Sequence, residues 1–117
     1  MTVKRGRERK GKMSVEFKKQ DDVLIIAITG EIDHHETKTL REKIDNEMQS
    51  GDFGKMIFDF SRTTFMDSSG LGLILARYRK AKELGIELEI ANPGEKNARI
   101  LYMAGIDKLI TITGVKK

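Results

Sequence analysis

Two kinds of apolar pattern alternate along this chain, and their alternation is the strongest constraint on its fold. Short β-branched or alternating apolar segments predict strands, at 14–19, 23–29, 55–60, 86–91 and 109–113. Apolar residues three or four positions apart predict helices over 37–48, from just after Asp67 to Gly85, and over 95–104. The order of these segments predicts one α/β domain with a mixed sheet of about four to five strands carrying helices.

This order of segments also predicts where the helices and loops lie. Right-handed crossovers place the apolar helix stripes against the sheet. The expected packing residues are Leu40, Ile44, Leu71, Ile74 and Leu75. Loops that follow the carboxyl ends of parallel strands meet at one edge, where open α/β sheets bind their ligands. We therefore expect the segments 30–36, 61–68 and 92–94 to gather there.

The charge is concentrated at the N-terminus. The chain of 117 residues has a formal net charge of +4, but residues 1–12 contain six basic side chains against Glu8 alone. The remainder is close to neutral and lacks the basic stripe and aromatic set typical of nucleic-acid-binding proteins. We expect residues 1–12 to be a disordered basic tail, or a start site assigned upstream of Met13, and 13–117 to be the single folded domain.

Cysteine is absent, and no apolar run approaches the ~18 residues of a membrane-spanning helix. No apolar segment of signal-peptide type follows the basic N-terminus. These features exclude disulfides and a thiolate zinc site, and they predict a cytoplasmic protein that makes no membrane contact.

The segment Asp67-Ser68-Ser69-Gly70-Leu71-Gly72 opens the second predicted helix with two glycines in one turn. Glycine in a helix interior costs ~1 kcal/mol relative to alanine, so the pair indicates that another group approaches this turn closely. Asp67 is the expected N-cap, which leaves Ser68 at the positive end of the helix dipole. A phosphate there would add about −1.5 to −2 charges beside Asp67. Local chemistry leaves two interpretations open, a phosphorylation switch or ordinary helix capping.

Other chemical motifs are incomplete. A nucleophile elbow needs glycine two residues before the serine, where Met66 and Asp67 stand. A dinucleotide fingerprint would need a third glycine at Leu75. The segment 33–36 holds both histidines between two acids, but no distant third ligand accompanies it, so we expect solvated or partner-contacting loop residues. We predict no catalytic residue, no metal site and no cofactor.

Two segments together resemble one bacterial family. TGEIDHHETKTLREKI, followed by FDFSRTTFMDSSGLGLILARYRKAKELG, is closely similar to the anti-sigma factor antagonists, in particular those of the sporulation type. Their domain is the sulfate transporter and anti-sigma antagonist (STAS) domain. The resemblance extends from about Met13 to about Thr113 and implies the STAS fold.

The resemblance implies a regulator rather than an enzyme. In this family the unphosphorylated antagonist binds an anti-sigma factor that is also an ATP-dependent serine kinase, and this binding frees the sigma factor. The kinase phosphorylates the serine after the motif aspartate, here Ser68, and the phosphorylated antagonist dissociates. A metal-dependent serine phosphatase restores the first form.

The resemblance also assigns roles to neighbouring residues. Asp33 matches the loop carboxylate that faces a basic residue of the kinase, Asp67 matches the acidic neighbour of the phosphoacceptor, and Ser69 matches the normally unmodified serine. The expected partner-binding residues are Asp33, Asp67, Ser68, Ser69, Gly70 and Gly72. We expect a monomer that binds no nucleic acid.

Two alternatives stay open. A general-stress or stressosome-type regulator of the same fold would keep Ser68 as its switch but answer to a different kinase. A nucleotide- or anion-binding STAS module would instead use the helix N-terminus at Ser68 to hold a phosphate.

Overall fold

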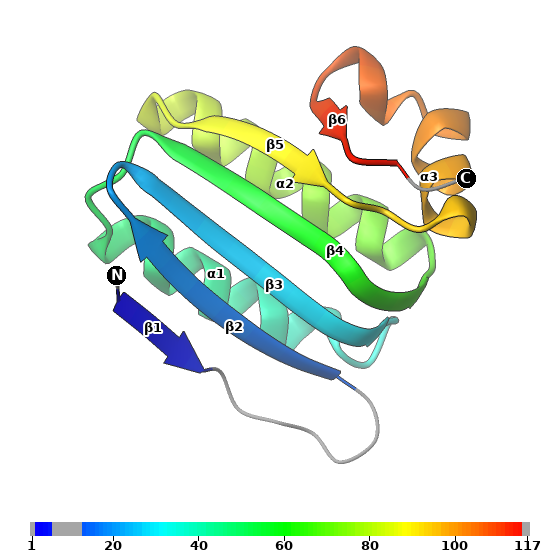
Figure 1. Ribbon diagram of the computed structural model, residues 1–117, viewed down its shortest axis with the longest axis horizontal. Coiled ribbons are helices and arrows are strands. Elements are labelled where there is room, and N and C mark those ends of the chain that lie inside the picture. The colour runs from blue at the N-terminus through cyan, green and yellow to red at the C-terminus, as the bar shows by residue number, and fades with distance from the viewer. Residues whose placement is uncertain (1, 6–12, 116–117) are drawn as a thin grey trace.

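A six-stranded mixed sheet forms the centre of the computed structural model, which describes residues 2–5 and 13–115 (Figure 1). The strands lie in sequence order: β1 (Thr2–Arg5), β2 (Met13–Gln20), β3 (Val23–Ile32), β4 (Lys55–Met66), β5 (Glu87–Ala91) and β6 (Thr111–Thr113). The helices are α1 (Thr37–Ser50), α2 (Ser68–Leu84), α3 (Glu95–Met103) and the short 3-10 helix η1 (Ile106–Lys108). The pairs β1–β2 and β2–β3 are antiparallel, and β3, β4, β5 and β6 are mutually parallel.

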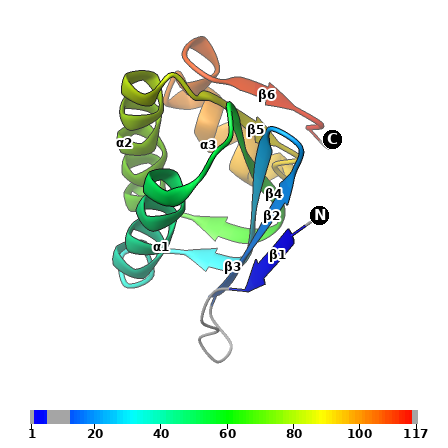
Figure 2. The same cartoon turned by 90° about the vertical axis from the view of Figure 1, so that its left-hand side faces the viewer.

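The helices α1 and α2 cover one face of the sheet, and the opposite face of β2, β3 and β4 carries no helix (Figures 1 and 2). Alternate residues of the central strands point into the core beneath these helices, as Ile26 and Phe58 do. Leu40 and Ile44 of α1 are fully buried against them, as expected. The predicted α/β class and mixed sheet are confirmed, with five strands in the described range 13–115.

The N-terminal segment differs in part from its expected disorder. Thr2–Arg5 form β1, paired with β2 from Thr2 opposite Lys19 to Arg5 opposite Glu16. Pairing satisfies backbone groups that the edge of β2 would otherwise leave open, which explains why so short a strand forms. The other residues of the predicted tail, 1 and 6–12, lie outside the described residues.

The strand β4 is longer than the sequence pattern indicated, and the prediction of a loop over 61–68 is wrong. The strand continues to Met66, and β3 likewise continues to Ile32. Two register shifts interrupt their pairing, between Ala27 and Thr29 and between Gly30 and Glu31. Such bulges break the two-residue alternation of side chains, which is why the pattern was not recognisable as a strand.

The turn 92–94 does not join the other loops, contrary to expectation. The last residue of β5, Ala91, pairs with Asp59 in the middle of β4. The turn therefore lies seven residues before the end of β4, roughly 20 Å away at the rise of a strand. The helix α3 occupies the place beside the second half of β4, where the side-chain amide of Asn97 donates to the carbonyl of Thr63 at 2.9 Å.

The buried face of α2 includes residues that were not predicted. Its buried residues are Gly70, Leu73, Ile74, Arg77 and Ala81, and the predicted Leu71 and Leu75 pack against the core but are only partly buried. An arginine thus occupies a core-facing position. Its Nε lies 3.1 Å from Oδ1 of Asp45 on α1, and the side chain is 7 % exposed. Burial lowers the pKa of Arg77, Asp45 opposes this shift, and the nearby Arg41 adds to it.

Candidate phosphorylation site

The candidate site lies where β3 and β4 end side by side. Ile32, the last residue of β3, pairs in parallel with Met66, the last residue of β4. Asp33 and Asp67 follow these two residues directly, so the register brings the two predicted carboxylates to the same edge of the sheet. The backbone N–H of Asp67 donates to the carbonyl of Ile32 at 3.3 Å and joins the two segments.

Asp67 is the N-cap of α2, as its position in the sequence predicted. Its Oδ1 accepts a hydrogen bond from the backbone N–H of Ser69 at 2.9 Å and another from the Ser69 hydroxyl. The Ser69 hydroxyl is the main cause that lowers the pKa of Asp67, and the backbone N–H groups of Ser69, Gly70 and His34 lower it further. The cap is therefore a carboxylate anion at neutral pH.

The two serines differ in their surroundings. Ser68 is the first residue of α2 and is exposed. Its hydroxyl has no hydrogen-bond partner among residues 2–5 and 13–115, whereas the Ser69 hydroxyl is tied to Asp67. An enzyme that modifies this turn from solvent would find Ser68 free and Ser69 occupied.

Asp33 orders the loop that leads into α1. Its Oδ1 accepts from the backbone N–H groups of His35 at 3.0 Å and Glu36 at 3.1 Å, immediately before α1 begins. The side chain is partly exposed, and His34 and His35 beside it are exposed. The loop is thus rigidly shaped and presents one carboxylate at the surface near Asp67.

The two glycines of the turn have different roles. A Cβ on Gly70 would lie 2.5 Å from Cγ of Met66 and 3.3 Å from Cγ2 of Ile32, so this glycine lets α2 pack closely against the ends of β4 and β3. A Cβ on Gly72 would meet nothing within 4 Å. The prediction of bare, approachable backbone thus describes Gly72, which is exposed, and does not describe the buried Gly70.

One aromatic residue at this edge was not among the candidates expected from the sequence. Phe65, next to Met66 at the end of β4, is 47 % exposed, although it is large and apolar. The sequence signal was the adjacent apolar pair Phe65 and Met66, because two neighbouring residues of a strand point to opposite faces and cannot both face the core.

Comparison with known proteins agrees with this geometry. The family model of the STAS domain matches residues 14–115. The chain belongs to the STAS domain family. It is 32 % identical over 100 residues to the anti-sigma F factor antagonist of Paenibacillus polymyxa, with 86 % of each chain covered. It is 29 % identical to the anti-sigma-B factor antagonist of Bacillus subtilis, covering 86 % of this chain and 91 % of that protein.

Solved structures of the antagonist SpoIIAA are similar as well, both at 27 % sequence identity. The unphosphorylated form matches with a TM-score of 0.74, over 84 % of this chain and 86 % of that one. The phosphorylated form, from Bacillus, matches with a TM-score of 0.67, over 84 % and 89 %. The STAS fold expected from the resemblance is therefore confirmed.

Two features are absent from the described ranges 2–5 and 13–115. They contain no group of three or more histidine, cysteine, aspartate or glutamate side chains placed to hold a metal ion. None of their helices has the length and apolar character needed to cross a membrane.

Proposed function

We propose that this protein is an anti-sigma factor antagonist whose partner is an anti-sigma factor with serine kinase activity. Unphosphorylated, it binds that factor and frees the sigma factor. Phosphorylation of Ser68 by the bound kinase ends the complex, and a metal-dependent serine phosphatase reverses it. The observation that carries the proposal is the exposed, unbonded hydroxyl of Ser68 beside the Asp67 carboxylate, on a chain similar to antagonists of this class.

The electrostatics of the turn support the switch. Asp67 is ionised and next to Ser68, and Asp33 lies at the neighbouring strand end. A phosphate on Ser68 would add about −1.5 to −2 charges to this edge. If the partner covers the turn, the phosphate must be buried near two carboxylates, at a cost of several kcal/mol. Each ~1.4 kcal/mol weakens binding tenfold, so this cost turns a tight complex into a weak one.

The proposed interface combines one charged and one apolar element. Asp33 supplies a carboxylate for a basic residue of the kinase, and the half-exposed Phe65 supplies an apolar anchor. Aromatic residues commonly dominate binding energy when a partner covers them. The exposed Gly72 adds helix surface without a side chain. We propose residues 13–117 as the domain that carries this function, as a monomer in the cytoplasm where the kinase meets ATP.

The deciding experiment is phosphorylation with purified components. The protein is incubated with ATP and an anti-sigma F factor, and intact mass and fragmentation locate the modification. We expect one phosphate on Ser68, none on the Ser68→Ala variant, and unchanged labelling of Ser68 in Ser69→Ala. Labelling of Ser69 in the unaltered protein, or no labelling by a kinase that is active on its own antagonist, contradicts the proposal.

A second candidate partner is the kinase of general-stress regulation, since the chain is also similar to the anti-sigma-B factor antagonist of Bacillus subtilis. The same assay with an anti-sigma-B factor separates the two. Faster phosphorylation by that factor, with Ser68 still the acceptor, would assign the protein to general-stress control and keep the switch intact.

A further inference from the structure

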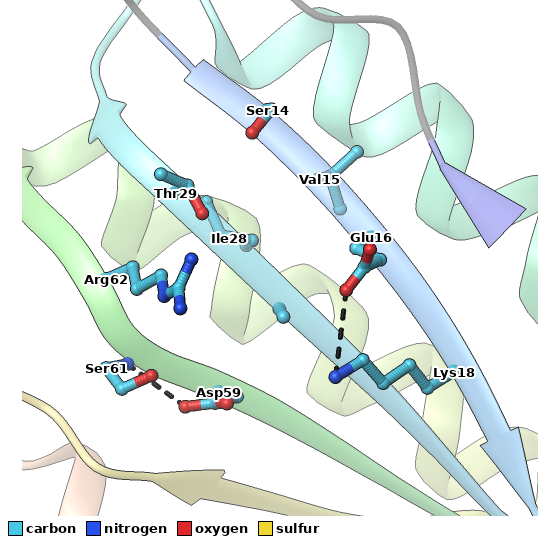
Figure 3. A pocket seen from close by; sticks show the side chains of 10 residues that line it. Ser14, Val15, Glu16, Lys18, Ile28, Thr29, Asp59, Ser61 and Arg62 are labelled. Atoms are coloured by element: carbon cyan, nitrogen blue, oxygen red, sulfur yellow. Dashed lines mark hydrogen bonds and ion pairs between the residues drawn. The ribbon is translucent and has the colours of Figure 1, made fainter. Parts of the chain in front are cut away.

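The open face of the sheet holds a hollow whose lining does not include Ser68. It has a volume of about 530 Å³ and lies on β2, β3 and β4, on the face without helices (Figures 1 and 3). Small residues form its floor, with Ala27 in the centre between Glu16 on β2 and Asp59 on β4. This size falls in the range of pockets that enclose small ligands.

A row of polar side chains crosses the hollow. Ser14 pairs with Thr29, and Thr29 pairs with Arg62, so the three lie side by side on three strands. Paired residues on one face have Cβ atoms about 4.5–5.5 Å apart, so one small ligand can reach all of them. Ser61 lies next to Arg62 at the same rim. The row therefore presents three hydroxyls and one guanidinium.

A β-bulge directs Arg62 into this row. Between the pairs Ala27–Asp59 and Thr29–Arg62, β3 advances by two residues and β4 by three. In a regular strand Arg62 would point to the same side as the buried Phe60 and would enter the core. The extra residue turns it to the open face, where its guanidinium points toward Thr29 in Figure 3. Bulges commonly re-aim a side chain at binding sites.

Arg62 is available for a ligand, unlike the other charged groups of the hollow. Lys18 lies 3.7 Å from Glu16. Oδ1 of Asp59 accepts hydrogen bonds from the backbone N–H of Ser61 at 3.0 Å and the side-chain amide of Asn92 at 3.3 Å. In the described part of the chain, Arg62 has neither a hydrogen bond nor an ion pair.

We propose that this hollow binds a small polyol or sugar carrying one phosphate group. Arg62 and the hydroxyls of Ser14, Thr29 and Ser61 hold the phosphate oxygens, because a guanidinium fork matches phosphate geometry. Asp59, on the adjacent row, accepts from the hydroxyls at the other end of the ligand through its Oδ2, because Oδ1 already accepts from Ser61 and Asn92. The site is separate from Ser68, so it gives the regulator a small-molecule input that acts independently of phosphorylation.

The test is an amide NMR titration of the unphosphorylated protein with glycerol 3-phosphate, and in parallel with inorganic phosphate. We expect saturable shifts at Ser14, Thr29, Ser61 and Arg62, and weaker binding of inorganic phosphate because it lacks the hydroxyls that reach Asp59. Arg62→Met should weaken binding of glycerol 3-phosphate by about tenfold or more, as expected for a lost charge-assisted contact. The matched control is Arg79→Met, at an exposed position of α2 outside the hollow, and it should leave binding unchanged.

Three outcomes would overturn the proposal. One is shifts confined to the first turn of α2, which would place the phosphate at that helix N-terminus. Another is equal loss of binding in the Arg62 and Arg79 variants, which would indicate nonspecific charge attraction. The last is the absence of saturable shifts with glycerol 3-phosphate while far-UV circular dichroism shows the protein folded.

Discussion

The buried ion pair between α1 and α2 should respond asymmetrically to the loss of its two members. Arg77 is 7 % exposed, whereas Asp45 is 28 % exposed and also lies 3.5 Å from Nζ of Lys80. Asp45→Asn leaves the buried Arg77 cation without a counter-charge, next to Lys80 and near Arg41. Arg77→Met removes the buried charge and fills a similar volume. Asp45 then remains in contact with solvent and with Lys80, which keeps its charge compensated.

The size of the asymmetry follows from desolvation. Removing one partner of a buried pair typically costs 3–5 kcal/mol when a charge is left uncompensated, whereas an apolar replacement of similar volume is often neutral. Since Asp45 is 28 % exposed and the pair is therefore only partly buried, we expect the lower end, about 3 kcal/mol, for Asp45→Asn. We expect less than about 1 kcal/mol for Arg77→Met.

Urea unfolding monitored by circular dichroism at pH 7 measures both changes. With a slope of about 2 kcal/mol per molar urea, Asp45→Asn should lower the midpoint by about 1.5 M, and Arg77→Met by less than about 0.5 M. The double variant should resemble Arg77→Met, because the uncompensated cation is gone. Equal destabilisation by Arg77→Met and Asp45→Asn would refute a dominant role for the uncompensated Arg77 cation.

Three further predictions concern the candidate site. Gly70→Ala should destabilise the protein by about 1–3 kcal/mol, because the added methyl group overpacks the core. Gly72→Ala should stabilise it by up to ~1 kcal/mol, because the methyl group meets no other atom. Equal urea midpoints for the two variants would contradict this difference. Ser69→Ala removes the main cause of the lowered pKa of Asp67, so an NMR titration should show that pKa rising. The Ser69→Ala variant should be less stable by about 1 kcal/mol at pH 7. This difference should shrink as the pH falls through the folded-state pKa of Asp67, and a difference independent of pH would contradict the role of the Asp67 carboxylate. Asp33→Asn keeps the side-chain oxygen that accepts from His35 and Glu36 but loses the charge, so its urea midpoint should stay unchanged. Its binding to the kinase should weaken and depend less on salt, and unchanged binding would remove Asp33 from the interface.

Local chemistry made the ends of α2 predictable from sequence. Asp67 caps the helix with its side chain, and Gly85 ends it in the left-handed region at φ 74°. Both depend on residues within one turn of the helix end, so they can be inferred without knowing the rest of the fold. The order of strands and helices was predictable for a similar reason, because the spacing of apolar residues that identifies each element lies within that element.

What the sequence did not predict depends on partners distant in the chain. Arg77 appears as a solvated residue in a helical pattern, and only Asp45 on another helix makes its burial tolerable. The strand over 61–66 was missed because its bulges are defined against β3. Local chemistry did not separate Ser68 from Ser69, although the family resemblance did, and in the structure the hydrogen bond from Ser69 to Asp67 distinguishes the occupied hydroxyl from the free one.

The cap of α2 links the stability of the turn to the proposed switch. A helix N-terminus would by itself attract a phosphate, because its dipole and free N–H groups favour negative charge. Asp67 already supplies that charge, and its Oδ1 takes the N–H and hydroxyl of Ser69. A phosphate on Ser68 therefore meets an N-terminus that is already neutralised, beside an anion that folding keeps ionised. Asp67 thus both caps the helix and occupies the site that could have neutralised a phosphate on Ser68. The charge of the phosphate would therefore remain uncompensated within the protein and would repel acidic groups of a docked partner.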